Sequence, residues 1–277
     1  MKKIIILFLN VIFINLLFSN SFKLHLLFTN NIHGAIHEVP ARFINPEFSP
    51  ILAGGAGAFT YASKLRKEAK LEKDFVMLTD AGNIFQGSQL GTYDGGSNII
   101  KWMNWMAYDA LAPGVRDFDQ GVNNLSQLAS EANFPFIASN LEGVDGIEDY
   151  KIINANGVKI GLIGLITPFI SEGLLPEYYE GVAVSDIMKT LGAQIEKIRS
   201  DVDLIFVLSH LGIPYDREDE YDDFIKDIEQ GVERPIRNAI ELAHFTDEVD
   251  VIITGGVSKG YDTPWVDPTN HTIVLQN

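Results

Sequence analysis

Short apolar runs alternate with longer amphipathic segments along almost the whole chain. The apolar runs have the length and the polar or glycine-rich borders of buried strands. They are Leu24–Phe28, Phe75–Leu78, Phe134–Ala138, Ile160–Leu165, Leu204–Leu208 and Val249–Thr254. Helical spacing predicts helices between them, over 57–70, 97–108, 121–133, 184–200 and 217–244. This alternation predicts an α/β fold with a largely parallel sheet.

Smaller features refine that picture. Asn156-Gly157 lies between two short apolar runs and predicts a hairpin, because Asn-Gly favours a tight turn. Trp102, Trp105 and Met106 recur at helical spacing, so we expect them in the core. The acidic run 216–229 matches no EF-hand spacing, so a solvated helix face is expected there rather than a calcium site.

The N-terminus has the layout of a signal peptide over residues 1–21. Lys2 and Lys3 precede a mostly apolar run, Ile4–Phe18, and small residues follow at 19 and 21. A membrane anchor is the alternative, but the run is short for a bilayer span. We therefore expect an exported protein, periplasmic or extracellular, whose mature form begins near Phe22 and has no membrane anchor.

Composition narrows the possible functions. The chain has 37 acidic and 21 basic residues, a formal charge of −16, which argues against a nucleic-acid polymer as partner. It contains no cysteine, so disulfides, thiolate nucleophiles and cysteine-based zinc sites are excluded. No internal repeat or linker divides residues 22–277, which we expect to form one domain.

Polar residues gather directly after the predicted strands, where parallel α/β sheets bind their ligands. Asn31 and His33 follow the first strand, Asp80 and Asn83 the second, and His210 the fifth. A carboxylate at position 31 would complete a compact metal-binding pair with His33. Asn31 offers only a neutral carbonyl oxygen.

Five ordered motifs make the pattern specific. They are FTNNIHG (28–34), TDAGNIFQGS (79–88), PGVRDFDQG (113–121), SHLG (209–212) and GGVSKG (255–260), accompanied by FPFIASNL (134–141) and GVKIGLIGL (157–165). From about residue 23 to its last residue the chain resembles the calcineurin-like metallophosphatase domain of the secreted 5′-nucleotidase and UDP-sugar hydrolase family. The resemblance implies two mixed β-sheets flanked by helices. It also implies hydrolysis of nucleotides or UDP-sugars by two zinc or manganese ions, roughly 3.5–4 Å apart.

Most of the family's metal ligands are replaced here. By resemblance, the metal positions are Asn31, His33, Asn83 and His210, and only the two histidines are retained. Asn83 stands where the family has its bridging aspartate, and Val115 stands at an asparagine ligand. No histidine occurs between Gly255 and Gly260. Hard or borderline cations need anionic oxygen, so we expect no bound metal cofactor.

The family's His–Asp pair, which stabilises the leaving phosphate, corresponds to Arg116 and Asp119, and its neighbouring glutamate to Asp117. Losing two metals and two carboxylates while gaining Arg116 and Lys259 leaves the formal charge of the site unchanged. One hypothesis is therefore a metal-free site in which Arg116 and Lys259 bind phosphate or a nucleotide. The alternative is drift without catalytic selection, with Arg116 paired to Asp117 or Asp119.

Three functions remain open. The chain is a catalytically impaired or inactive relative of the 5′-nucleotidases, acting by binding a ligand or a protein partner. Alternatively, it is an active phosphohydrolase with an altered site, for example one metal on His33, His210 and Asp80. The third reading is a non-functional truncated product, because the family's C-terminal nucleotide-binding domain is expected to be absent.

Overall fold

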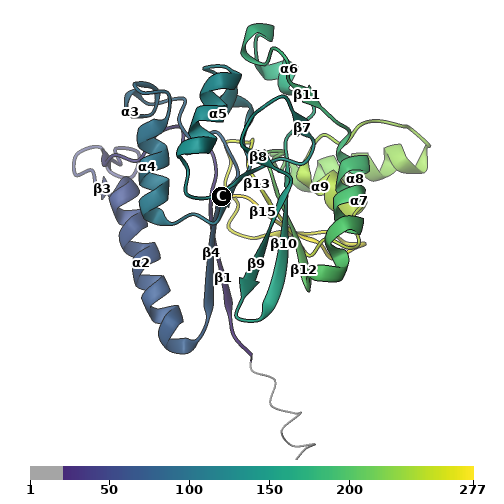
Figure 1. Ribbon diagram of the computed structural model, residues 1–277, viewed down its shortest axis with the longest axis horizontal. Helices are drawn as coiled ribbons and strands as arrows, with labels where there is room; N and C mark the ends of the chain where they lie inside the picture. The colour runs from purple at the N-terminus through teal and green to yellow at the C-terminus, as the bar shows by residue number, and fades with distance from the viewer. Residues whose placement is uncertain (1–20) are drawn as a thin grey trace, which may run out of the picture.

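The computed structural model describes residues 21–277 of the chain. Apart from Ser21, the expected signal peptide (residues 1–21) lies outside the described residues. Two β-sheets stack face to face, with helices on both outer surfaces (Figure 1). The expected α/β sandwich is therefore confirmed, although only one of its two large sheets is mixed in strand direction.

The first half of the chain builds a five-stranded sheet in which all neighbouring strands run parallel. Its order is β1 (Leu24–Thr29), β4 (Phe75–Asp80), β5 (Ala110–Leu111), β6 (Phe136–Ile137) and β8 (Ile147–Glu148). The register pairs Thr29 with Asp80, so β1 and β4 end side by side. The polar residues that follow these two strands are thereby brought together.

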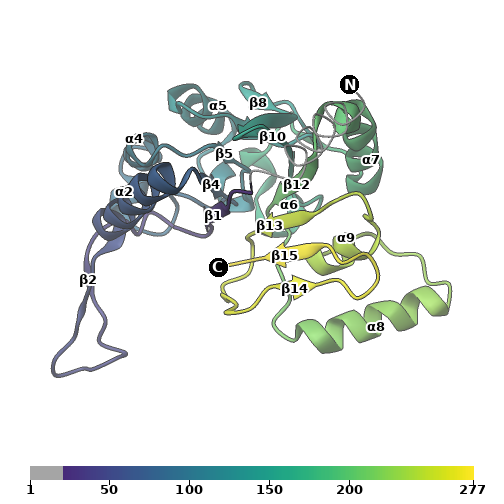
Figure 2. The same cartoon turned by 90° about the horizontal axis from the view of Figure 1, so that it is seen from below.

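The second half builds a six-stranded sheet of mixed direction. Its order is β14 (Trp265–Val266), β15 (Ile273–Leu275), β13 (Val251–Thr254), β12 (Leu204–Ser209), β10 (Val158–Leu165) and β9 (Tyr150–Ala155). Figure 2 shows β13, β15 and β14 side by side at one edge. The predicted hairpin joins β9 to β10, with Asn156 and Gly157 at φ of 53° and 100° as a tight turn of this kind requires.

Three apolar layers hold the sandwich together. Side chains of β12 alternate between two of them, because successive residues of a strand point to opposite faces. Phe206 and Leu208 pack between the two sheets, whereas Ile205 and Val207 pack outward. The third layer lies outside the five-stranded sheet and includes Leu78, Leu111 and Phe136.

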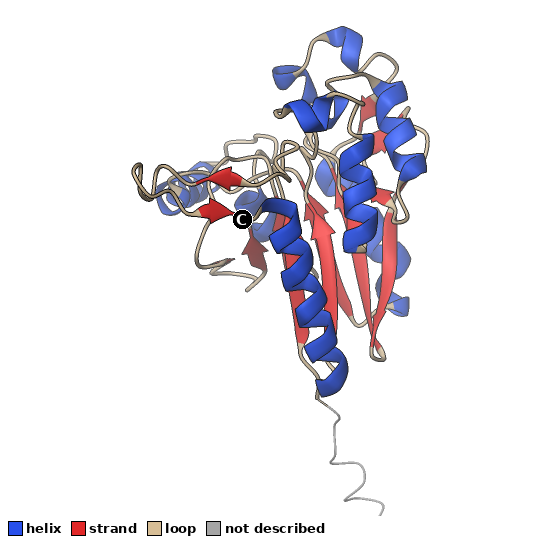
Figure 3. Cartoon of the chain, turned by 90° about the vertical axis from the view of Figure 1, so that its left-hand side faces the viewer, coloured by secondary structure: helices blue, strands red, loops and turns tan. Residues whose placement is uncertain are grey.

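Helices cover both outer surfaces, as the blue elements of Figure 3 show. Those associated with the five-stranded sheet are α2 (Gly54–Glu72), α3 (Gln89–Thr92), α4 (Ser97–Met106) and α5 (Val122–Glu131). Those packed on the six-stranded sheet are α7 (Ile187–Ile198), α8 (Arg217–Glu229) and α9 (Ala239–His244). The short helix α6 (Ile170–Gly173) and the strands β7 (Leu141–Glu142) and β11 (Ala183–Val184) lie in the connections. None of the helices in residues 21–277 combines the length and the apolar character needed to cross a membrane.

The single helix expected over 217–244 is wrong. Helix α8 ends at Glu229, and Gly231 follows with φ of 72°, a left-handed conformation that ends helices. Helix α9 begins afresh after its N-cap Asn238, whose side chain accepts from the N–H groups of Ile240 and Glu241.

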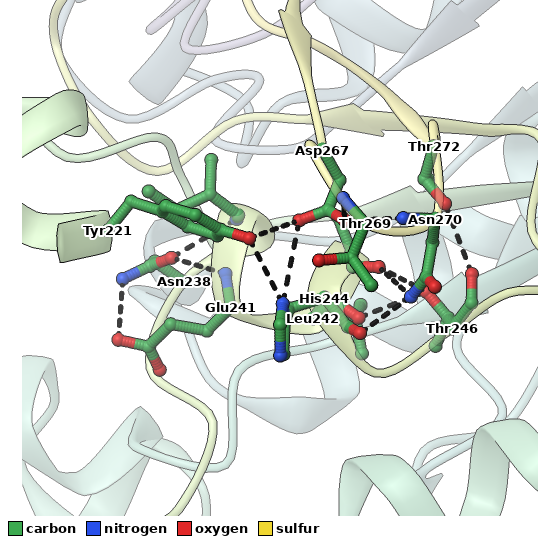
Figure 4. A network of polar contacts seen from close by, with 12 residues as sticks. Tyr221, Asn238, Glu241, Leu242, His244, Thr246, Asp267, Thr269, Asn270 and Thr272 are labelled. Carbon is green, nitrogen blue, oxygen red and sulfur yellow. Dashed lines mark hydrogen bonds and ion pairs between the residues drawn. The ribbon is translucent and has the colours of Figure 1, made fainter. Parts of the chain in front are cut away.

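A polar network joins the two helices to the sheet edge (Figure 4). The Asp267 carboxylate accepts hydrogen bonds from the Tyr221 hydroxyl of α8 and from two backbone N–H groups of its own turn. The Asn270 amide donates to the carbonyls of Ala243 and His244, which end α9. The buried side chain of Asp267 therefore has a structural role.

The expectation that all three large side chains of α4 are in the core is wrong for one of them. Met106 is buried and Trp102 is partly buried, but Trp105 is 75% exposed.

A second feature that the apolar pattern did not predict lies nearby. Strands β2 (Val39–Pro40) and β3 (Ile51–Leu52) form a hairpin that projects from the body of the molecule (Figure 2).

Candidate functional site

The candidate site lies at the carboxyl ends of both sheets, where the loops after β1, β4, β12 and β13 meet. The first two loops continue the pairing of their strands through backbone hydrogen bonds. Asn31 N donates to the Gly82 carbonyl at 2.9 Å, and His33 N donates to the Asn83 carbonyl at 3.0 Å. These bonds fix residues 31–33 against residues 82–83.

Three of the predicted site residues have a strained backbone. Asn31, His33 and Asn83 have φ values of 49°, 50° and 62°, in the left-handed region that non-glycine residues rarely adopt. Such strain persists where surrounding bonds determine the conformation, and it is concentrated at functional sites. Here it turns the two amides toward each other.

A chain of hydrogen bonds through two side-chain amides crosses the site. The backbone N–H of Arg116 donates to Asn83 Oδ1 at 2.8 Å. Asn83 Nδ2 donates to Asn31 Oδ1 at 3.0 Å, and Asn31 Nδ2 donates to the Val257 carbonyl at 3.0 Å. The two ends of the chain are a backbone donor and a backbone acceptor, so only one orientation of each amide satisfies every bond.

Two carboxylates could not make this chain. Ionised aspartates only accept hydrogen bonds, so residues 31 and 83 would face each other without a proton between them, and the Val257 carbonyl would lose its donor. Like charges at such a distance also disfavour the ionised pair unless a cation lies between them. The amides therefore supply by hydrogen bonding the cohesion that bridging metals would supply to carboxylates.

The two retained histidines share one tautomer. His33 Nδ1 lies 2.7 Å from the Gln86 carbonyl, and His210 Nδ1 contacts the Ala81 carbonyl. A carbonyl oxygen only accepts, so each Nδ1 carries a proton. In the neutral form of either ring, Nε2 is then the atom that can bind a metal or accept a proton.

His210 is held in its neutral form. Burial lowers its pKa to about 4, while its bond to the Ala81 carbonyl opposes that shift and the nearby His33 adds to it. Since His210 is only 4% exposed, the neutral imidazole is the form that fits its surroundings. It also connects the sheets, because Ala81 follows β4 and His210 follows β12.

Asp117 joins the loop after β4 to the loop that contains Gly114. Its carboxylate is fully buried and accepts the backbone N–H groups of Asn83, Ile84 and Gly114, each at 2.8 Å. Burial raises its pKa to about 6, and the three hydrogen bonds work against that rise. The sequence suggests Asp117 as the counterpart of a family glutamate or as a partner of Arg116, whereas in this structure it positions Asn83.

Arg116 lies on the rim of the site and contacts Asp119. Arg116 Nη1 is 3.5 Å from Asp119 Oδ1, and half of the arginine side chain (51%) remains exposed. Asp119 is mostly covered, and this burial raises its pKa while Arg116 opposes the rise. Asp117, by contrast, accepts only backbone hydrogen bonds and does not pair with Arg116.

Lys259 is not brought together with Arg116 by any contact among the described residues. Its Nζ donates to the Tyr215 carbonyl at 2.7 Å and lies 4.8 Å from the centre of the Tyr261 ring. The loop that carries Lys259 does reach the site, through the Val257 carbonyl that accepts from Asn31. Arg116 is therefore the predicted cation whose contacts lie at the site.

Asp80 is turned away into a buried network. Its Oδ2 accepts from Thr29 Oγ1 at 2.5 Å, and its Oδ1 accepts from the Gly82 N–H at 2.7 Å. The Thr29 hydroxyl lies 2.8 Å from the Tyr108 hydroxyl. Burial raises the pKa of Asp80 well above its usual value. Asp80 therefore has no free oxygen that faces His33 and His210.

The donor set does not fit a pair of divalent metals. Both amide oxygens at positions 31 and 83 already accept hydrogen bonds, Val115 packs with the outer apolar layer, and Asp80 is committed elsewhere. In residues 21–277 no three His, Asp or Glu side chains come together as a metal-binding group. What the site presents are a buried neutral imidazole, a second imidazole, a chain of amides and one half-exposed guanidinium.

Sequence comparisons show that the chain is similar to 5′-nucleotidases. It is 30% identical over 212 residues to a snake venom 5′-nucleotidase of Crotalus adamanteus, a match that covers 72% of this chain and 34% of that protein. It is 28% identical over 247 residues to a 5′-nucleotidase of Vibrio vulnificus, covering 86% of this chain and 40% of that protein. The chain thus spans well under half the length of these relatives. No protein-family model matches it.

Comparison with solved structures agrees. The crystal structure of the calcineurin-like phosphoesterase YfkN from Bacillus subtilis superposes with a TM-score of 0.62 at 26% identity. That match covers 83% of this chain and 71% of the solved one.

Proposed function

Since the chain belongs to the 5′-nucleotidase family of calcineurin-like phosphoesterases, we propose that it is a member that has lost phosphoester hydrolysis and keeps its site loops together without metal. The observation that carries this proposal is the hydrogen-bonded chain from Arg116 N through Asn83 and Asn31 to Val257 O. The side-chain oxygens at positions 31 and 83 each accept a hydrogen bond within this chain and carry no negative charge, so neither supplies the anionic oxygen that a bridging cation needs.

Hydrolysis requires an activated water and neutralisation of charge at phosphorus. In a two-metal site the cations supply both. Here His33 and His210 each offer an Nε2 lone pair, but no carboxylate with a free oxygen joins them. A single half-exposed guanidinium replaces four formal positive charges. The site therefore lacks the means to activate water that the family relies on.

The test is metal content together with phosphate release. We would incubate the protein with zinc and manganese, desalt it, and count bound metal per chain, then assay a nucleoside monophosphate and a UDP-sugar. The matched comparison is the variant Asn31→Asp/Asn83→Asp/Val115→Asn/Arg116→His, which restores four ligand or catalytic positions. We expect less than 0.1 metal per parent chain, on the order of background, and no turnover. Tightly held metal with phosphate release by the parent would instead support the altered-site phosphohydrolase.

A second function, metal-free binding of a phosphate group, is favoured by one specific observation. Arg116 makes a single long contact to Asp119 and keeps half of its side chain exposed at the site. A guanidinium in that state can bind a phosphate in bidentate fashion. We would titrate inorganic phosphate and nucleotide in the presence of EDTA, comparing the parent with Arg116→Ala and with Arg42→Ala, an exposed arginine outside the site. Equal binding by all three proteins would contradict this role.

We also propose that the protein is exported. The basic start and the apolar run before residue 19 support this, as does the small residue at position 21. Mass spectrometry of the secreted chain would show an N-terminus near Phe22. An uncleaved chain retained in the cell would contradict the proposal.

A further inference from the structure

Large apolar side chains are exposed on one part of the molecule. The β2–β3 hairpin, the first turns of α2 and the end of α4 carry many of them, and we call seven of these side chains the hairpin face. Its members are Phe43, Ile44, Phe48, Ile51, Leu52, Phe59 and Trp105. An exposed apolar surface of this extent marks an interaction site more often than an ordinary soluble surface.

The tip of the hairpin is an ordered protrusion. Phe43 and Phe48 are 82% and 84% exposed, so neither belongs to the core. The side-chain oxygen of Asn45 accepts the N–H groups of Glu47 and Phe48, and Ser49 Oγ donates to the Asn45 carbonyl. These bonds hold the backbone of the turn in a set conformation, which lowers the entropy lost on binding.

A hollow of about 540 Å³ lies next to the hairpin, between α2 and α4. It is lined by Gly55, Ala56, Phe59, Thr60, Trp102 and Trp105. Trp102 is fixed by the bond from its Nε1 to the Gly55 carbonyl. A protruding aromatic tip and an aromatic hollow thus occur on the same side of one molecule, as the positions of the hairpin, α2 and α4 in Figure 2 show.

The charge of this region differs from that of the rest of the chain. The segments that carry the hairpin face, residues 36–61 and 97–106, contain Glu38, Glu47, Arg42 and Lys101, whose charges cancel, whereas the whole chain carries −16. Two copies that meet through the hairpin face would therefore avoid bringing their strongly acidic parts together.

The exposed apolar area of the hairpin face is also large enough for a stable dimer interface. A large apolar or aromatic side chain offers roughly 150–250 Å², so the seven members expose on the order of 800 Å² per copy. A stable protein interface needs about 800 Å² from each partner. A surface that contains both the protrusion and its receptor is self-complementary, which is what a twofold dimer requires.

We propose that the hairpin face is the interface of a twofold homodimer, in which the Phe43–Phe48 tip of each copy fills the α2–α4 hollow of the other. Trp105 lies at the edge of the hollow and closes over the entering tip. This inference is independent of the proposed loss of hydrolysis, because it involves none of the site residues.

The oligomeric state tests it directly. Sedimentation equilibrium of the full chain at micromolar concentration should give the mass of a dimer. Phe48→Ser and Trp105→Ser should each raise the dimer dissociation constant at least tenfold, whereas Leu175→Ser, an exposed leucine outside the hairpin face, should leave it unchanged. A parent protein that stays monomeric at 100 µM, a concentration on the order of a weak interface's Kd, overturns the proposal. If that monomer also binds vesicles containing phosphatidylglycerol, the hairpin face belongs to a lipid surface instead.

Crosslinking tests the reciprocal arrangement. The chain has no cysteine, so a disulfide can be introduced without background. The double variant Glu47→Cys/Thr60→Cys places one thiol at the tip and one in the hollow, and it leaves the aromatic side chains intact. With diamide as oxidant it should form covalent dimers, while each single variant stays monomeric on a non-reducing gel. Crosslinking of the Glu47→Cys single variant would show that tips meet tips, and would overturn the proposed arrangement.

Discussion

At the scale of single residues, the side-chain bond between Asn31 and Asn83 sets the stability of the site. Asn83→Asp keeps the acceptor for Arg116 N but removes the donor to Asn31 Oδ1, leaving two oxygens 3.0 Å apart. We expect a loss of about 1–3 kcal/mol of unfolding free energy in EDTA. Urea unfolding would measure it, with Asn154→Asp as control, since that exposed side chain acts only as an acceptor. Equal stability of both variants would contradict the importance of this bond.

Two buried titratable groups predict the pH dependence of stability, with opposite signs. Burial raises the pKa of Asp117 to about 6, so its contribution is present below about pH 4 and is lost as pH rises through 6. Burial lowers the pKa of His210 to about 4, so its contribution is present above about pH 6.5 and is lost as pH falls through 4. Between pH 4 and 6 these two effects oppose each other, and Asp80, whose pKa burial also raises, acts in the same direction as Asp117.

Replacing His210 should remove its contribution to the pH dependence and leave that of Asp117. In His210→Asn the amide can still donate to the Ala81 carbonyl, but nothing titrates at that position. We expect the unfolding free energy of this variant, relative to the parent, to fall by on the order of 3 kcal/mol as pH rises from 4 to 6.5. Denaturant unfolding at several pH values measures it. A constant difference across that range would show that His210 is not held neutral by the fold.

The site residues illustrate what sequence can and cannot reveal at this scale. Positions after strands identified Asn31, Asn83 and His210, because parallel strands deliver their carboxyl ends to one edge. Asp117 was missed as an anchor, because its partners are backbone N–H groups, two of them more than thirty residues away. Its only signal was an acidic residue within a glycine-containing loop, and that signal does not specify a partner.

At the scale of elements, Asn238 shows how one cap defines a helix. Its side chain accepts the N–H groups of Ile240 and Glu241, and its Nδ2 donates to Glu241 Oε1 at 2.9 Å. We expect Asn238→Ala to reduce the unfolding free energy by about 1–2 kcal/mol, and Asn238→Ser, which keeps a capping oxygen, to reduce it by less. Thermal unfolding of both variants tests this. Identical melting temperatures would mean that packing alone holds α9.

The same region explains a failed prediction. Helical spacing continued over 217–244, since both α8 and α9 bury one face in the same apolar layer. Periodicity reports which face is buried, not whether the backbone is continuous. The break between the two helices depends on Gly231 and Pro235, since glycine and proline interrupt helices. The β9–β10 hairpin was predicted because Asn-Gly specifies both a turn and its geometry.

At the scale of the whole molecule, net charge should make stability depend on salt. A formal charge of −16 implies mutual repulsion in the compact state, and salt screens it. We expect the melting temperature to rise by roughly 2–4 °C between 20 and 300 mM sodium chloride, about 1 kcal/mol for a protein of this size. Asp222→Asn/Glu229→Gln, on the acidic face of α8, should show a smaller rise. A fall with salt would indicate that surface ion pairs outweigh the repulsion.

The architecture of the molecule was predictable because its apolar runs are buried on both faces and read as continuous strands. The hairpin face was not, because it depends on apolar side chains that fail to enter the core. Trp105 has the same spacing as its buried neighbours, and only the packing of α2 against α4 leaves it outside. In the sequence such a surface has the apolar pattern of a core, and only the structure shows that it is exposed.

The amide chain also has a consequence for the history of the protein. Asn83→Asp alone breaks the bond between residues 31 and 83, and Asn31→Asp alone removes the donor to the Val257 carbonyl. Each single change costs one bond of the chain, yet the full ligand set for a cation is still missing. Under the proposed loss of the metal site, a return to metal-dependent chemistry would pass through intermediates that are less stable and still lack the ligand set. On that proposal, the hydrogen bonds that hold the loops together make the loss easier to keep than to reverse.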